Sequence, residues 1–297
     1  MTSIVIAFVI SSLGLASGSV FYKMGAERQA DQKSSPALLC FFYFFLAAVG
    51  YVVACFVTDA SFSPTFPTLI TAIIGGLCFG AAAYLYIVSL SCGPFTISAV
   101  LLNFSNFAPI LYCLVFPGDT VGLVTVSGVV LMVISVYILT SRNKSGNETP
   151  INAKWIISIA LTFITNSIIS YMIRIQDYYA TKNGVSESTL FYVILFGSAA
   201  LIALVIFIAT GGLKIKQRAH RLLTPAVGLA LTISANVFPQ SILYSKGVPT
   251  AVQSPVINGS AILLAALFGR VFFKDKLSAK SWCGIAIGII AIVLLNI

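Results

Sequence analysis

Ten apolar stretches, separated by short polar breaks, constrain the fold of this chain more than any other feature of its sequence. A helix needs about 20 apolar residues to cross the hydrocarbon core of a bilayer. Lipid offers no hydrogen-bond partners, so a crossing segment must pair its own backbone groups, as a helix does. The sequence therefore predicts an all-α membrane protein with ten transmembrane helices. The stretches run over residues 3–22, 36–57, 68–90, 95–116, 121–140, 155–178, 189–210, 222–245, 250–273 and 280–297.

The composition favours a lipid environment and argues against several functions. Of the 297 residues, 59% are hydrophobic and only 8% are charged, whereas soluble domains carry about 25% charged residues. The net charge of +9 arises in short loops, as in membrane proteins with basic cytoplasmic loops, so we expect no nucleic-acid binding. One histidine, six cysteines without C-x-x-C spacing and no phosphate-binding glycine loop predict no metal, no cofactor and no enzymatic activity.

A polar stretch near the middle, residues 141–154, predicts a linker between two five-helix repeats. We expect the first repeat over residues 1–145 and the second over residues 146–297. Because five is odd, two tandem halves enter the membrane from opposite sides and are related by an axis in the membrane plane. Inverted repeats of this kind are common in secondary transporters, whose substrate site lies near the membrane midplane between the repeats.

Matching landmarks in the two halves support a duplication. The turn glycines Gly93 and Gly247 lie 154 residues apart, and the acidic residues Asp119 and Asp275 lie 156 residues apart. A glycine then follows at the same offset in the last helix of each half, at Gly128 and Gly284.

With these landmarks the chain resembles the drug/metabolite transporter superfamily, in its ten-helix EamA-type branch. The resemblance implies an inverted-repeat carrier with a central cavity and alternating access. The acidic turns depart from the Gly-Glu that is frequent in the family, because this chain has Gly118-Asp119 and Lys274-Asp275. Family members usually place both termini in the cytoplasm. Here 14 of the 17 Lys and Arg residues lie on one side, which predicts a multi-pass protein of the plasma or inner membrane with both termini outside.

Polar side chains recur four residues apart along several of the expected helices, which places them on one helix face. Helix-to-helix polar contacts in membranes contribute only about 0.6 kcal/mol on average, whereas an unpaired buried amide costs about 2–7 kcal/mol. Packing alone therefore explains so many amides poorly, although it remains the alternative for each one. We expect the set to line a cavity and bind a substrate. Its members are Tyr84, Asn103, Asn106, Asn166, Ser170, Asn236, Gln240, Tyr244, Gln253 and Asn258.

Two prolines and two basic residues complete the candidate site. Pro109 and Pro255 interrupt corresponding helices of the two halves and are interpreted as hinges, with a simple helix bend as the alternative. Lys23, at the expected end of the first helix, and Arg174, near the end of the sixth, could attract a carboxylate or phosphate. The alternative is that both only anchor helix ends at the interface. The three G-x-x-x-G spacings, Gly14/Gly18, Gly76/Gly80 and Gly284/Gly288, predict close helix packing.

These patterns favour a carrier of a small polar metabolite. No Asp or Glu lies in the central part of any expected helix, so a neutral, zwitterionic or anionic substrate is preferred over a cationic drug exchanged for protons. The alternative is a flippase or scramblase for a lipid-linked or amphipathic substrate. An intramembrane enzyme would need paired carboxylates or an activated nucleophile, which the sequence lacks. The expected partners are the substrate and the lipid bilayer, and the expected state is a monomer or homodimer.

Overall fold

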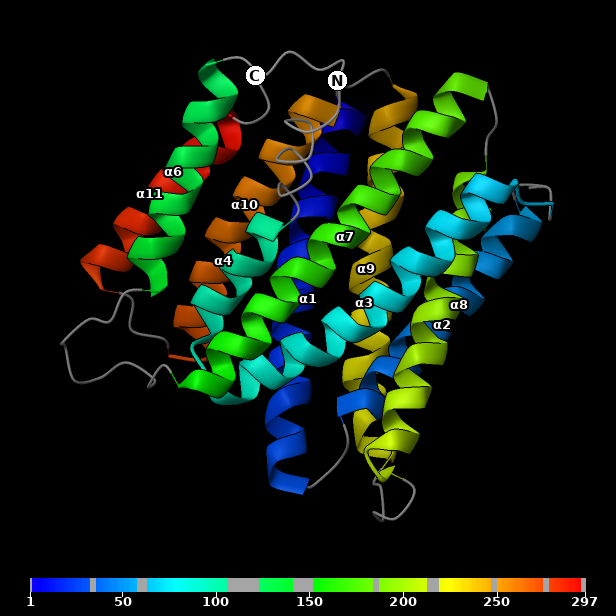
Figure 1. Ribbon diagram of the computed structural model, residues 1–297, viewed down its shortest axis with the longest axis horizontal. Coiled ribbons are helices and arrows are strands. Elements are labelled where there is room, and N and C mark those ends of the chain that lie inside the picture. Colours follow the sequence, from blue (N-terminus) through cyan, green and yellow to red (C-terminus); the bar gives the residue numbers. More distant parts are fainter. Residues whose placement is uncertain are drawn as a thin grey trace. The chain divides into compact units, whose positions relative to one another are not determined.

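The computed structural model describes residues 2–32, 36–57, 63–105, 123–140, 152–183, 187–212, 219–246, 250–274 and 278–294. This part of the chain forms ten α-helices and contains no strands (Figure 1). The all-helical class predicted from the sequence is therefore confirmed for these residues. The helices are α1 (Thr2–Gln32), α2 (Pro36–Val57), α3 (Phe66–Cys92), α4 (Phe95–Ser105), α6 (Leu123–Thr140), α7 (Ala153–Asn183), α8 (Ser188–Ala209), α9 (Ala219–Ser245), α10 (Thr250–Phe272) and α11 (Ala279–Leu294).

The apolar stretches locate the helices closely, with one clear exception at the end of α1. The stretch 36–57 coincides with α2, and the stretch 189–210 lies one residue from the bounds of α8. Lys23 was expected to end the first helix, but α1 continues to Gln32. The residues after Lys23 include Met, Ala, Glu, Arg and Gln, which favour helix without being apolar. Hydropathy thus marks the lipid-compatible part of this helix and not its end.

Five helices of the described residues are long and apolar enough to cross a membrane. The apolar segments in the remaining described helices span 10–17 residues. Large aliphatic side chains point outward along the five spans, which suits contact with lipid tails and is unusual for a surface in water. These features are those of a membrane-embedded protein. The spans are Ser3–Glu27, Pro36–Val57, Phe66–Cys92, Ala153–Ile173 and Thr189–Ala209.

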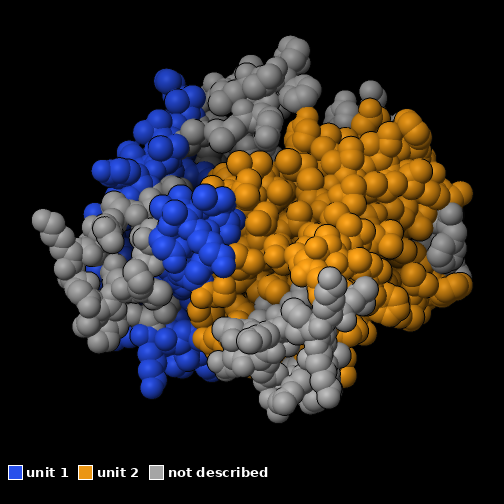
Figure 2. Space-filling view, turned by 60° about the horizontal axis from the view of Figure 1, so that its bottom comes forward, with its two compact units in different colours: residues 1–20, 92–159, 232–297 blue, residues 21–91, 160–231 orange. Residues whose placement is uncertain are grey.

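The chain divides into two compact units, each assembled from both halves of the sequence (Figure 2). Unit 1 comprises residues 1–20, 92–159 and 232–297, and unit 2 comprises residues 21–91 and 160–231. Three long helices, α1, α7 and α9, contribute a segment to each unit. The expected repeats over residues 1–145 and 146–297 describe an internal duplication and stay a prediction.

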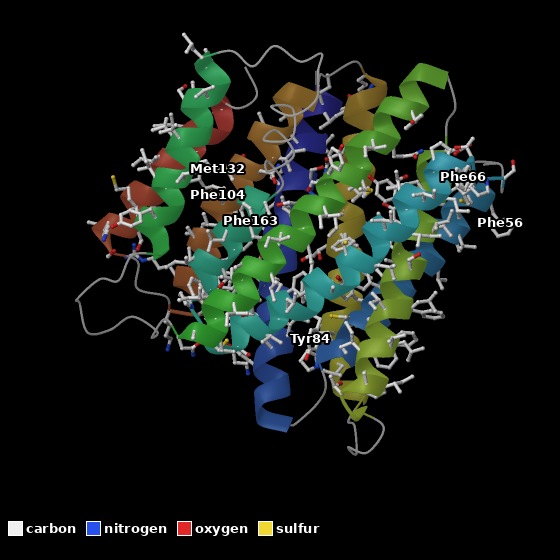
Figure 3. The ribbon with its side chains drawn as sticks, viewed as in Figure 1. Phe56, Phe66, Tyr84, Phe104, Met132 and Phe163 are labelled. Carbon is white, nitrogen blue, oxygen red and sulfur yellow. The ribbon has the colours of Figure 1, made fainter. Side chains whose placement is uncertain are left out.

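In unit 1, α6 packs along α11, and α4 packs against α10. A small residue brings the first pair together, because a Cβ added at Gly288 of α11 would meet the ring of Phe104 and the hydroxyl of Ser135. The hydroxyl of Ser135 donates to the backbone oxygen of Gly284 at 2.6 Å. Phe104 on α4 and Met132 on α6 are both buried in this unit (Figure 3). The G-x-x-x-G spacing of α11 therefore serves close packing, as the sequence predicted.

In unit 2, α2 packs along α8. The rings of Phe44 and Tyr51 on α2 both lie against the ring of Phe196 on α8. Close packing is confirmed for the second G-x-x-x-G spacing too, since Cβ atoms added at Gly76 and Gly80 would overlap the backbone of α8. In contrast to these buried contacts, the exposed rings of Phe56, near the end of α2, and Phe66, at the start of α3, point away from the unit (Figure 3).

Candidate functional site

Two reciprocal hydrogen bonds between Ser11 and Asn236 join α1 and α9 within unit 1. The hydroxyl of Ser11 donates to the backbone oxygen of Asn236 at 2.9 Å, and Asn236 Nδ2 donates to the backbone oxygen of Ser11 at 3.1 Å. Gln240, one turn further along α9, donates to Asn236 O at 3.0 Å and to Asn236 Oδ1 at 3.1 Å. Gly14 allows this approach, because a Cβ there would lie 2.8 Å from the backbone nitrogen of Asn236. Asn236 and the amide nitrogen of Gln240, which belong to two of the three predicted site residues of α9, are thus hydrogen-bonded to protein groups.

The amides of α4 and α10 lie deeper in unit 1. Asn258 on α10 is 8% exposed, and Asn103 on α4 is 3% exposed. Asn103 Nδ2 donates to the backbone oxygen of Ala99 at 2.8 Å, four residues back on the same helix. Asn103 Oδ1 is buried and has no hydrogen-bond partner among the described residues. An unsatisfied buried acceptor costs about 1–3 kcal/mol.

The Gly-Pro turn before α4 is fixed by a buried tryptophan at the start of α7. Trp155 Nε1 donates to the hydroxyl of Ser98 at 2.9 Å, and that hydroxyl donates to the oxygen of Pro94 at 2.8 Å. Gly93 presses against the indole of Trp155 so closely that a Cβ would overlap the ring. Asn152 caps the start of α7, since its Oδ1 accepts from the backbone nitrogen of Trp155 at 2.7 Å. Hydrogen bonds and close packing within unit 1 therefore hold the Gly-Pro turn in place.

Lys23 lies in unit 2, where it contacts the end of α3. Its ammonium donates to the backbone oxygen of Leu90 at 2.7 Å, one of the last four carbonyls of that helix. A cation at this position satisfies an otherwise unpaired carbonyl and complements the helix dipole. This contact favours the anchoring alternative for Lys23. The neighbouring Tyr22 shares a hydrogen bond between hydroxyls with Tyr43.

The other predicted residues of unit 2 lie on α3 and α7. Tyr84 is half-buried on α3 (Figure 3). Ser170 on α7 donates to the backbone oxygen of Asn166 at 3.1 Å, within the same helix. Such back-bonding satisfies a serine without any ligand, so Ser170 adds little evidence for a site. Asn166 is half-buried on the same helix.

Part of the predicted set lies outside the described residues. This applies to Asn106 and Pro109, which follow the described end of α4. The helix positions of a further four are described, but their side chains are not. These four are Arg174 on α7, Tyr244 on α9, and Gln253 and Pro255 on α10. α10 is helical on both sides of Pro255, and a hinge at either proline stays a prediction.

Glu187 is a buried acidic residue that the sequence reasoning missed. It precedes α8 and is only 5% exposed. The backbone nitrogen of Thr65, at the start of α3, lies 3.2 Å from each carboxylate oxygen, and the hydroxyl of Thr65 donates to Oε2 at 2.9 Å. Burial by itself raises the pKa of this carboxyl, but hydrogen bonds from Thr68 and Thr65 outweigh burial and hold the pKa below its usual range. The carboxylate therefore ties the starts of α3 and α8 together within unit 2.

A weak sequence signal for Glu187 did exist. The run Ser186-Glu187-Ser188 directly precedes an apolar stretch, which is typical of a helix start. Its partner Thr65 lies 122 residues earlier, and no local pattern connects the two. Elsewhere in the described residues, no group of three or more His, Cys, Asp or Glu side chains could hold a metal ion.

Comparison with known proteins adds information about the fold. No family model matches the chain, and no curated protein matches its sequence. Among solved structures, 23 chains match, and one of them is a crystal structure of a protein that covers 99% of this chain and 96% of its own. The TM-score of that match is 0.65 at 15% sequence identity. At this identity the likeness shows that the two chains share a fold over nearly their whole lengths, and nothing about activity.

Proposed function

We propose that this chain is a secondary transporter of the plasma or inner membrane that moves a small polar metabolite by alternating access. The proposed architecture is two inverted repeats of five helices with a central cavity between them, as in EamA-type members of the drug/metabolite transporter superfamily. The orientation we favour places both termini outside, because the basic residues are concentrated in the loops of one side.

One observation carries the proposal: helices at equivalent positions of the two expected repeats pack against each other. In the order of the ten expected helices, α2 and α8 are the second of each half and are in contact within unit 2. The fourth pair, α4 with α10, and the fifth pair, α6 with α11, are in contact within unit 1. Two-fold related repeats produce such pairing wherever equivalent helices lie next to the axis. Inverted repeats in a membrane protein are most familiar from secondary transporters.

The chemistry of the described residues argues against a cationic substrate that is exchanged for protons. Asn103 and Asn258 are amides buried in the helical part of unit 1. The buried carboxylate of the described residues, Glu187, lies outside the apolar spans and already holds Thr65. A proton-coupled exporter of cations would need a carboxylate available at membrane depth. We therefore favour neutral, zwitterionic or anionic metabolites.

Uptake by proteoliposomes tests this function. Purified protein is reconstituted and offered amino acids, sugars and quaternary ammonium dyes, with protein-free liposomes as the control. Saturable uptake of an amino acid or sugar supports the proposal. Movement of the dyes alone, dependent on a pH gradient, would refute the preferred substrate class. Flipping of fluorescent lipids without any solute uptake would establish the scramblase alternative instead.

A further inference from the structure

Asn103 is exceptional among the buried polar side chains of unit 1. Within the described residues of this unit, its Oδ1 is the one buried side-chain polar atom that lacks a hydrogen-bond partner. The neighbouring groups show how readily such atoms are satisfied, since the hydroxyls of Ser98 and Ser135 both have partners. An acceptor that stays unpaired among the described residues of this unit is available to a hydrogen-bond donor from outside the protein.

The geometry identifies which amide atom is available. Asn103 Nδ2 lies 2.8 Å from the backbone oxygen of Ala99. Only the amide nitrogen can donate to a carbonyl oxygen, so this contact fixes the orientation of the amide group. Oδ1 is then the acceptor that stays unused, and it can bind only a hydrogen-bond donor or a cation.

Asn103 projects from a different face of α4 than the side chain that contacts α11. The next residue, Phe104, is directed toward Gly288 of α11. Successive residues of a helix point about 100° apart, so Asn103 projects from a different face of α4 than Phe104. Asn258, also buried, lies on α10, the helix that packs against α4 in this unit.

The charges of unit 1 decide which kind of donor fits. The described residues of this unit contain no Asp or Glu. A bare cation at Oδ1 would therefore have no countercharge from them, and an unpaired charge is far more costly to bury than a neutral donor. A hydroxyl, an amide N–H, or the ammonium of a zwitterion that brings its own carboxylate avoids this cost.

We propose that Oδ1 of Asn103 accepts a hydrogen bond from a hydroxyl or N–H group of a neutral or zwitterionic solute, which makes Asn103 a binding residue. The inference rests on the proposed carrier function and narrows its substrate class. The empty protein then carries an unsatisfied acceptor, and the solute removes that penalty when it binds. The amide of Asn103 is consequently favourable for binding of the solute and unfavourable for the stability of the protein without solute.

The test uses the full-length protein with Asn103→Leu, which removes the acceptor at similar volume, and Asn103→Ala as a second variant in case leucine does not fit. Thr165→Val is the matched control, because the Thr165 hydroxyl also bonds only carbonyls of its own helix, at Leu161 and Thr162. Thermal unfolding is measured without solute. Uptake of glycine, glucose, myo-inositol and tetraethylammonium is then measured in proteoliposomes.

We expect Asn103→Leu to raise the melting temperature of the empty protein by at least about 2 °C. Uptake of a donor-bearing solute by either variant should fall about tenfold, which corresponds to the loss of one hydrogen bond. The control should leave uptake unchanged.

Three outcomes overturn the inference while leaving the carrier function intact. The first is undiminished uptake by both variants. The second is wild-type protein that carries tetraethylammonium alone. A melting temperature of Asn103→Leu equal to or below that of the wild type would show that Oδ1 is satisfied in the empty protein, which also overturns it. Wild-type protein that carries no solute at all would instead remove the proposed function on which the inference depends.

Discussion

Replacing Glu187 by glutamine should destabilise unit 2 by an amount that the structure allows us to work out. The carboxylate accepts hydrogen bonds from the backbone nitrogen and the hydroxyl of Thr65. Each hydrogen bond to a charged group contributes about 1.5–3 kcal/mol, and charge-assisted bonds are roughly twice as strong as neutral ones. Glu187→Gln keeps the shape but removes the charge, so halving two bonds gives a loss of about 1.5–3 kcal/mol.

The cysteines of α2 offer an assay that reports on the same unit. Cys40 and Cys55 are buried and not disulfide-bonded, so a thiol-reactive fluorescent dye labels them only when unit 2 opens. The melting midpoint followed with this dye should be lower for Glu187→Gln than for wild type at pH 7. Thr65→Val removes one of the two donors of Thr65 and should lower the midpoint by a smaller amount. The double variant should be less destabilised than the sum, because the two residues share one interaction.

The stability that Glu187 contributes should depend on pH. Its pKa is lowered in the folded protein, so the stabilisation is fully present above the unfolded pKa of about 4.3 and is lost as the pH falls through the folded pKa. The difference between wild type and Glu187→Gln should therefore be constant between pH 6 and pH 8, by this linkage, and shrink below about pH 4.3. Equal melting midpoints of wild type and Glu187→Gln at pH 7 would show that the carboxylate does not hold the starts of α3 and α8 together. A difference between the two midpoints that persists undiminished in acid would show the same.

Two further predictions concern glycines. Gly14→Ala should destabilise the protein by about 1–3 kcal/mol, because its Cβ would lie within 3 Å of the backbone of α9. Gly50→Ala, with nothing within 4 Å of its Cβ, should stabilise the protein by about 0.4–1 kcal/mol. Thermal unfolding compares the two variants, and a Gly14→Ala variant as stable as wild type would contradict the close approach. Gly93→Ala should be strongly destabilising because its Cβ overlaps the indole of Trp155, and Trp155→Leu should relieve much of that loss in the double variant; strictly additive effects in the double-mutant cycle would argue against the contact.

Hydropathy predicted the helices well because a helix that crosses a bilayer must be apolar over about 20 residues. The stretch 36–57 coincides with α2, where proline begins the helix and polar residues follow it. It failed at α1, which continues past Lys23 to Gln32. A hydropathy profile marks where lipid contact ends, whereas residues with high helix propensity allow the helix to continue beyond that point.

The candidate site was less predictable, because polar spacing gives the face of a residue but not its partner. Four-residue spacing placed Asn236 and Gln240 on one helix face, and their amides are hydrogen-bonded to each other. The bond between Asn236 and Ser11 joins residues 225 apart in sequence, and it depends on Gly14 admitting the backbone of α9. Likewise, Thr65, the partner of Glu187, directly precedes another helix 122 residues away, so the sequence presents Glu187 as an ordinary acidic residue of a loop.

The amides of unit 1 show that satisfaction, more than polarity, separates packing residues from binding residues. Asn236 uses its amide on Ser11 and accepts from Gln240, so it stabilises the crossing of α1 and α9 without water or substrate. Asn103 lies deeper, yet half of its amide is unused. A membrane helix gains stability from the first arrangement and loses it from the second. Substitution by leucine should therefore destabilise the protein at position 236 and stabilise it at position 103. A residue that lowers the stability of the empty protein in this way persists most readily where an incoming ligand supplies the missing donor.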